Sequence, residues 1–217
     1  MKDSFTLAQE FVLLASDSET HKLRRPMRSY LQTYVVCAIL IELLSEEVIR
    51  VGDKGKLVVI QNQYDGDEAA LMMVQKLKQS SNTMKEWIQS LYSWGKDSSQ
   101  LFQAVVNPLV LSGYLMEEKY RKMLLFQATR YVPSTINKDR IIQRIRAELL
   151  ENGPVTQQTA LMTMMLEMSK LLKSYFSEYE QIELKKCVQR LHEEKGDEWD
   201  SIRLIRKTME EMDIGLG

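Results

Sequence analysis

The sequence has few of the residues from which disulfide-stabilised and metal-binding proteins are built. It contains 2 cysteines, Cys37 and Cys187, and 2 histidines, His21 and His192. Two cysteines cannot form a disulfide framework, and these four residues lack the spacing of zinc ligands. We therefore expect a reducing, cytoplasmic setting and neither a metal ion nor another cofactor.

The sequence also lacks an excess of one charge and a long hydrophobic run. Its 29 basic and 30 acidic residues leave a net charge of −1, so no overall field draws the protein to nucleic acid or to a membrane. The most apolar stretch, Tyr34 to Leu44, is much shorter than the roughly 20 residues that span a bilayer. The N-terminus, MKDSFTLAQEFVLL, has one lysine before its short apolar run and fits neither a signal peptide nor a transit peptide.

The segment Tyr34 to Leu44 is apolar on every side of a helix, and its only charged residue is Glu42. A helix of this kind is buried on all faces, so we expect it to be the centre of the fold. A short β-hairpin follows, with strands at Val48–Val51 and Lys56–Ile60 joined by the turn Gly52–Gly55.

The remaining chain alternates helix starts with amphipathic runs. Thr6 with Gln9 and Thr83 with Glu86 form capping-box patterns, and Asp67 can cap the helix that follows it. Further helices are expected in the segments 100–112, with a kink or a new start at Pro108, then 137–149, 160–176, and two amphipathic helices near the C-terminus. A second hairpin is predicted with strands at 113–116 and 123–126.

The passage from helix to hairpin occurs twice. Leu44 to Ile49 and Val110 to Leu115 can be aligned at an offset of about 66 residues, which suggests two related units. The predicted fold is mainly α, a helical bundle in which amphipathic helices wrap a central buried helix, with one or two short β-hairpins. We expect residues 1–217 to form a single domain.

The sequence contains no pattern typical of an enzyme. There is no Gly-rich phosphate loop, no Gly-x-Ser-x-Gly elbow and no set of metal ligands, so we predict no enzymatic activity. A winged-helix nucleic-acid binder is an alternative for a helix followed by a hairpin. It is disfavoured because Tyr34 to Leu44 is almost wholly apolar and has no basic side chain to present to bases.

The most cationic segment lies before the central helix and is the candidate lipid-binding site. Four cations at about 1 kcal/mol each would give about 4 kcal/mol at an anionic membrane, so shallow insertion of apolar side chains is needed as well. The cations are Lys22, Arg24, Arg25 and Arg28, and the apolar residues between them are Leu23 and Met27.

A series of segments in this order resembles the Golgi phosphoprotein 3 family over roughly residues 5–192. The segments are FTLAQEFVLLA, CAILIELLSEEVIRV, YDGDEAALMMVQKL, WIQSLYSW, VLSGYL, LLFQATRYVP and IIQRIRAELL. The resemblance implies a mostly helical, non-enzymatic domain with a projecting hairpin that can mediate self-association. Eukaryotic members are peripheral membrane proteins that bind phosphatidylinositol 4-phosphate and act as adaptors for glycosyltransferases. The chain begins almost at the domain itself, so we expect a compact member of the prokaryotic type.

The resemblance also implies positions for the headgroup pocket, where the family uses a Trp and three Arg. The matching positions here are Met27, Val36, Ser99 and Phe102, none of which can hold a phosphate through a charged fork. We therefore expect weak binding of anionic lipid at the inner face of a membrane, or binding of a membrane-associated or glycan-building enzyme. The alternative is a protein-only scaffold that dimerises through the hairpin Val48 to Ile60.

Overall fold

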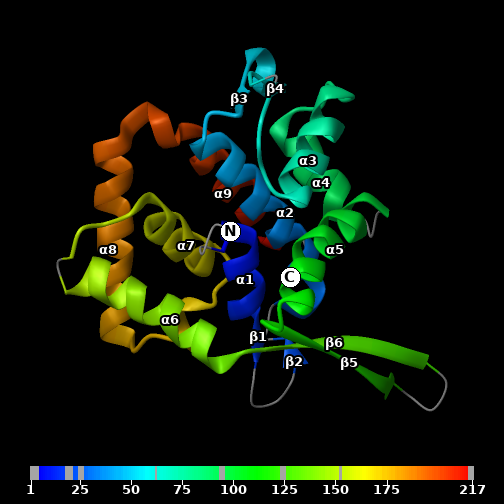
Figure 1. The fold of residues 1–217 in the computed structure, drawn as a ribbon. Helices are drawn as coiled ribbons and strands as arrows, with labels where there is room; N and C mark the ends of the chain where they lie inside the picture. The colour runs from blue at the N-terminus through cyan, green and yellow to red at the C-terminus, as the bar shows by residue number, and fades with distance from the viewer. Residues whose placement is uncertain are drawn as a thin grey trace.

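The computed structural model describes residues 5–17, 22–23, 27–61, 63–92, 96–122, 126–151 and 153–214. Helices surround one central helix, α2 (Met27–Ser45), as Figure 1 shows. The elements, in chain order, are α1 (Leu7–Ala15), β1 (Ser16–Asp17), β2 (Lys22–Leu23), α2, β3 (Ile49–Val51), η1 (Asp53–Gly55), β4 (Leu57–Val59), α3 (Glu68–Lys78), α4 (Met84–Tyr92), α5 (Lys96–Leu111), β5 (Leu115–Lys122), β6 (Phe126–Pro133), α6 (Thr135–Ile145), η2 (Arg146–Leu150), α7 (Gln157–Met168), η3 (Leu172–Ser174), α8 (Glu178–Lys195), η4 (Gly196–Trp199) and α9 (Asp200–Ile214).

The prediction of a mainly helical bundle around a buried helix is confirmed. In α2, every residue from Tyr34 to Leu43 except Glu42 is buried, and the helix contacts α1, α3, α4, α5, α7 and α9. Such a helix is surrounded because it has no polar face to turn toward water. Within the described residues the strands form three two-stranded antiparallel sheets, β1–β2, β3–β4 and β5–β6.

The predicted helix caps are confirmed. The hydroxyl of Thr6 accepts the backbone N–H of Gln9 at 3.3 Å, and the Gln9 side chain accepts the N–H of Thr6 at 3.1 Å. The Asp67 carboxylate accepts the N–H of Ala70 at 2.8 Å. These bonds satisfy N–H groups that the first turn of a helix leaves without partners, so the start of each helix is determined locally.

The two predicted helix-to-hairpin passages have the same backbone geometry. At the end of α2, Glu47 has a φ of 54° and the N–H of Val48 donates to the carbonyl of Leu43. At the end of α5, Gly113 has a φ of 73° and the N–H of Tyr114 donates to the carbonyl of Leu109. These are Schellman-type helix ends, and each is followed by a hairpin.

The same hydrogen bond also closes both hairpins. The N–H of Ile60 donates to the carbonyl of Val48 at 2.9 Å, and the N–H of Ser134 donates to the carbonyl of Tyr114 at 3.0 Å. The four residues of these bonds occupy equivalent places after α2 and after α5. The resemblance between the two units is therefore a property of the backbone, although their sequences have little in common.

Two predicted boundaries were wrong, and one alternative for a third is excluded. Helix α5 does not begin anew at Pro108 but continues through it, because the burial of Leu101, Val105 and Leu109 outweighs the one backbone bond that proline cannot make. The helix predicted over 160–176 ends at Met168, where Lys170 takes a φ of 59° and terminates it. Strands β5 and β6 are longer than predicted, so that 117–121 lies inside β5 and not between the strands.

A buried ion pair joins α1 to α6 and α7. The Arg144 guanidinium donates to both carboxylate oxygens of Glu10 at 2.7 Å, and its Nε donates to the Thr159 hydroxyl at 3.0 Å. Glu10 is only 2% exposed, so its charge is compensated by Arg144 and not by water. Paired donors and acceptors of this geometry fix the relative position of three helices.

Candidate functional site

The predicted lipid-binding segment lies where β2 leads into the central helix. Lys22 and Leu23 form β2, which pairs with β1, and Met27 and Arg28 belong to the first turn of α2. Arg24 and Arg25 lie outside the described residues, as does His21. The structure therefore places the backbone of this segment but leaves the prediction that its cations converge untested.

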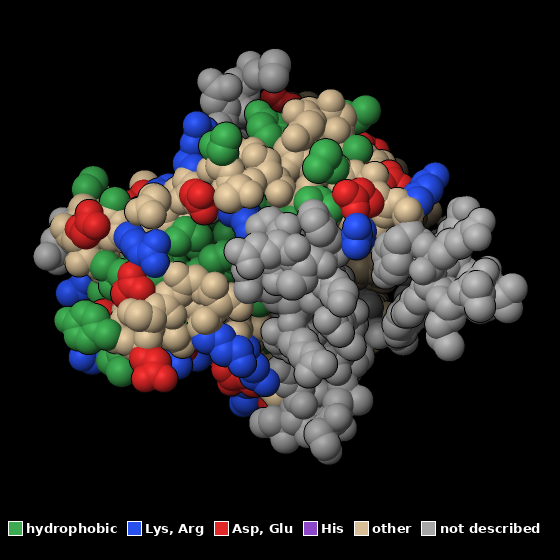
Figure 2. Space-filling model, turned by 90° about the horizontal axis from the view of Figure 1, so that it is seen from below, with side chains coloured by type: hydrophobic (Ala, Val, Ile, Leu, Met, Phe, Trp, Pro, Cys, Tyr) green, Lys and Arg blue, Asp and Glu red, His purple; other side chains and the backbone are tan. Residues whose placement is uncertain are grey.

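Strands β1 and β2 lie at the same end of the molecule as the base of the β5–β6 hairpin. Strand β1 contacts β6, and Figure 1 shows both strand pairs at its lower edge. Figure 2 views this end directly: where side chains are described, Lys and Arg side chains are interspersed with Asp and Glu. Among the side chains described at this end, cations therefore have anionic neighbours.

The four positions of the family's headgroup pocket are not equivalent in this structure. Val36 is fully buried in α2 and Phe102 is 5% exposed in α5, where its ring packs edge-on against Tyr131. Ser99 is exposed, and Met27 is the first residue of α2. Two of the four positions are therefore core positions, and Ser99 is the one described side chain among them that faces solvent.

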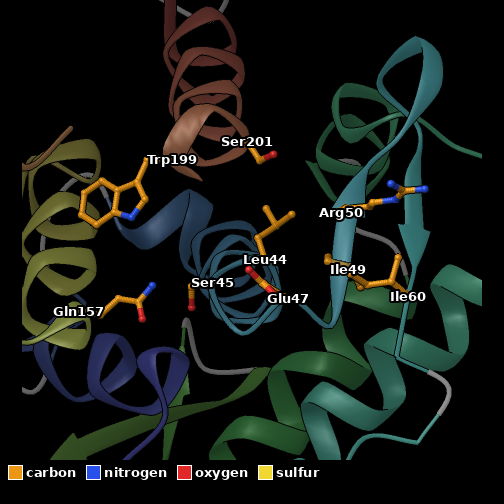
Figure 3. A pocket seen from close by; sticks show the side chains of 9 residues that line it. All are labelled: Leu44, Ser45, Glu47, Ile49, Arg50, Ile60, Gln157, Trp199 and Ser201. Carbon is orange, nitrogen blue, oxygen red and sulfur yellow. The ribbon is translucent and has the colours of Figure 1, made fainter. Parts of the chain in front are cut away.

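A cavity of about 280 Å³ lies at the opposite end of α2 (Figure 3). Its floor is the end of the central helix, with Leu44, Ser45 and Glu47. One wall is the β3–β4 hairpin, and the other is formed by the first residue of α7, the last residue of η4 and the start of α9. Sequence reasoning missed this site because its walls come from segments that are more than a hundred residues apart in the chain.

Beside this wall, the last residue of η4 contains a buried donor without an acceptor. Trp199 is 1% exposed, and its Nε1 has no hydrogen-bond partner among the described residues. Figure 3 shows this nitrogen on the edge of the indole that faces the end of α2. A buried N–H without a partner is costly, and the ring is held in place by an edge-on contact with His192 at 4.8 Å between centroids.

His192 is a buried residue and not a surface one. Its side chain is buried beneath η4 against Trp199, and neither ring nitrogen has a partner among the described residues. Burial, together with the positive charges of Arg203 and Arg206, lowers the pKa of His192 below its ordinary 6.5. His192 is therefore neutral at physiological pH and serves as a packing residue.

Glu42, the only charged residue of the central segment, has an unusual environment. Its carboxyl accepts the N–H of Leu7 at 3.2 Å, at the first turn of α1. Burial raises its pKa from 4.5 to about 8, and the negative charges of Glu46, Asp67 and Glu10 act in the same direction. Glu42 is thus protonated at neutral pH, which allows it to lie inside the bundle without a cationic partner.

The described residues show no constellation for catalysis by a metal or by a cysteine nucleophile. No three His, Cys, Asp or Glu side chains among them lie close enough together to hold a metal ion. Both cysteines are free, and burial raises the pKa of the Cys37 thiol to about 12, so it is not a reactive thiolate. In the part of the chain that the structure describes, no helix has both the length and the apolar character to cross a bilayer.

The comparison with protein families gives one result that covers nearly the whole chain. The profile of the Golgi phosphoprotein 3 (GPP34) family matches residues 7–212. No curated protein matches the sequence closely enough to be reported as a relative. The match includes α1, the central helix, both hairpins and almost all of α9, so it agrees in extent with the fold described above.

Proposed function

Because the chain belongs to the Golgi phosphoprotein 3 family, we propose that it is a non-enzymatic module that binds membranes peripherally and acts as an adaptor. The observation that carries the proposal is the position of β2 and the first turn of α2 beside the base of the β5–β6 hairpin. The backbone of Lys22 in β2 and of Arg28 in α2 lies at this end of the molecule, which supports the proposal. The segment would meet an anionic membrane by electrostatic attraction and shallow insertion of Leu23 and Met27.

The headgroup specificity should be low. The buried Val36 and Phe102 leave no room for a charged fork at two of the four family positions. A membrane surface attracts cations in proportion to its charge, whichever lipid supplies that charge. We therefore propose that the protein responds to the surface charge of the bilayer and does not distinguish phosphatidylinositol 4-phosphate from other anionic lipids.

Vesicle sedimentation tests this proposal. Vesicles with phosphatidylglycerol, and others with phosphatidylinositol 4-phosphate at equal surface charge, should retain the protein equally at low salt, and neutral vesicles should not. The R24E/R25E variant should be released, since it reverses two of the four cations. The matched control is K173E/K185E, which makes the same charge change at two exposed lysines elsewhere. Equal retention of both variants, or of the wild type on neutral vesicles, would refute the electrostatic mechanism.

A homodimer through the β3–β4 hairpin is the second candidate, and the exposure of two apolar side chains favours it. Val58 is 39% exposed and Ile60 is 45% exposed. The outer edge of β4 is already used, because the N–H of Leu57 donates to the carbonyl of Asn82. Self-association would then use the side chains or the edge of β3. Light scattering over a dilution series should give the mass of two chains, and V58E/I60E should reduce it to one.

A further inference from the structure

We propose that the apolar side chains at the base of the β5–β6 hairpin insert into a lipid bilayer and fix the depth at which the protein lies on it. These side chains are Leu111, Tyr114, Met116 and Ile136, and together they form the hairpin-base face. The inference rests on the proposed function, because it adds a second element to the same membrane-binding end. The new element acts through apolar burial, whereas the segment before α2 acts mainly through charge.

The hairpin-base face is built from the two junctions that connect the hairpin to the bundle. Leu111 ends α5 and Met116 lies in β5, with Tyr114 between these elements. Ile136 lies in the first turn of α6, shortly after the end of β6. The N–H of Ser134 donates to the carbonyl of Tyr114 at 3.0 Å and joins the two junctions. Segments that are distant in the sequence therefore contribute to one surface.

The side chains of the hairpin-base face are unusually exposed for their type. Leu111 is 87% exposed, Ile136 74%, Met116 59% and Tyr114 39%. Among the described residues, ten large apolar side chains are exposed, and four of these ten belong to this face. Figure 2 shows apolar side chains at the surface of this end of the molecule. A single exposed apolar residue is ordinary, whereas a group of them marks a surface that binds something.

The segments that carry the hairpin-base face are also free of charge. Residues 98–116 and 131–137 contain no Asp, Glu, Lys or Arg, although 27% of the chain is charged. The polar residues between the apolar ones are Ser112, Ser134 and Thr135. Small hydroxyl side chains are tolerated at the boundary between headgroups and acyl chains, where a charged side chain would be costly. The composition of the two junctions therefore suits the surface layer of a bilayer.

The location and the shape of the face favour lipid over a protein as its occupant. The hairpin base lies beside β1 and β2, at the end where the segment before α2 would meet a membrane (Figure 1). Leu111 and Ile136 project from the end of one helix and from the start of another. A protein partner would need a separate pocket for each side chain. Acyl chains are fluid and surround projecting side chains without such pockets.

The residues around the face limit the insertion to a shallow depth. Glu117 follows Met116 directly, and Glu118 pairs with Arg130 across the hairpin at 2.6 Å. These charges remain in the headgroup layer, because their transfer into hydrocarbon is unfavourable. The ring of Tyr114 is suited to the same layer, since it combines an apolar body with a polar hydroxyl. Only the projecting aliphatic side chains therefore reach the acyl chains.

Tryptophan placed in the hairpin-base face tests the insertion directly. L111W and I136W are measured with vesicles of phosphatidylcholine and phosphatidylglycerol that carry brominated acyl chains, because bromine quenches only indoles close to it. On these vesicles the added fluorescence, relative to the wild type with its 3 tryptophans, should move to shorter wavelength and fall by about twofold. L71W, at an exposed position of α3 away from this end, should show neither change.

Removal of the two most exposed side chains tests their contribution to binding. L111S/I136S should lower the vesicle partition coefficient by about tenfold, since two aliphatic side chains no longer leave water. Both positions are exposed, so the core is unchanged. The matched control is L71S/V155S, which removes two exposed apolar side chains on α3 and before α7 and should bind as the wild type does.

Failure of this inference can be distinguished from failure of the proposed function. If the wild type sediments with anionic vesicles but L111W and I136W are quenched no more than L71W, the proposed function stands and insertion of this face is refuted. Wild-type partitioning of L111S/I136S refutes it as well. A shift of the added fluorescence without vesicles would assign the face to a contact between copies of the chain and overturn the proposal. Absence of the wild type from every kind of vesicle refutes both.

Discussion

Replacement of Glu42 by Gln should make the stability of the protein less dependent on pH. Gln keeps an oxygen that can accept the N–H of Leu7, and it has nearly the shape of the protonated carboxyl. It cannot lose a proton. The variant therefore removes the ionisation of one group while it preserves the contact between α1 and α2.

The sign and size of the effect follow from the pKa. Glu42 has a pKa of about 8 in the folded protein and 4.5 as an ordinary glutamate, so the folded state retains a proton that the unfolded chain releases between these values. Its contribution to stability is complete below pH 4.5 and is lost as the pH rises to 8. The full shift corresponds to about 5 kcal/mol, and partial access of water to the side chain reduces this to about 2 to 4 kcal/mol.

Urea unfolding followed by circular dichroism measures this difference. The stability of E42Q relative to the wild type should increase by about 2 to 4 kcal/mol between a pH of about 4.5 and a pH of about 9. Titrating groups remote from Glu42, such as His192, contribute equally to both proteins and cancel. E117Q serves as the control, with no such increase. A stability difference between E42Q and the wild type that stays constant with pH would show that Glu42 is ionised in the folded protein, and the reasoning from burial would fail.

Four further changes should alter stability for separate reasons. R144L should destabilise by about 3 to 5 kcal/mol because it leaves the Glu10 carboxylate buried and unpaired, whereas E10L/R144L should recover most of this loss; urea unfolding of both variants checks this. S177A should cost about 1 kcal/mol of unfolding free energy, since Ser177 forms a capping box with the third residue of α8. K170G should raise the melting temperature slightly, because glycine adopts a φ of 59° without strain. H192F should remove a loss of stability below pH 6.5 that the lowered pKa of His192 produces, measured by unfolding across the acid range.

The parts of the fold that depend on local sequence were predictable. Thr6 with Gln9 determines the start of α1 through bonds between residues three apart, and the buried central helix follows from a segment with no polar face. The end of α7 was not predictable in this way, because Lys170 gives no sign in the sequence that it adopts a left-handed conformation. Strand β5 was underestimated because Glu117 and its charged neighbours show no alternation of apolar and polar residues.

The two candidate sites also differ in how far local sequence reveals them. The basic segment before α2 is continuous in the sequence and could be recognised from its charges, and its arrangement remains a prediction. The cavity at the other end of α2 joins Glu47, Gln157 and Trp199, which no spacing rule connects. Its recognition required the packing of α7 and α9 around the end of α2. Contacts between distant segments are what a single sequence conveys least.

Because the backbone geometry is the same after α2 and after α5, either hairpin could follow either helix. The chain leaves each helix through a residue with a positive φ, Glu47 or Gly113. The far end of each hairpin then donates a hydrogen bond to the carbonyl of the next residue, Val48 or Tyr114. A hairpin grafted onto the other helix should therefore form the same hydrogen bonds where it leaves the helix and where it ends. Variation in the length and chemistry of the hairpins could then accumulate during evolution without a change in the packing of the bundle that carries them.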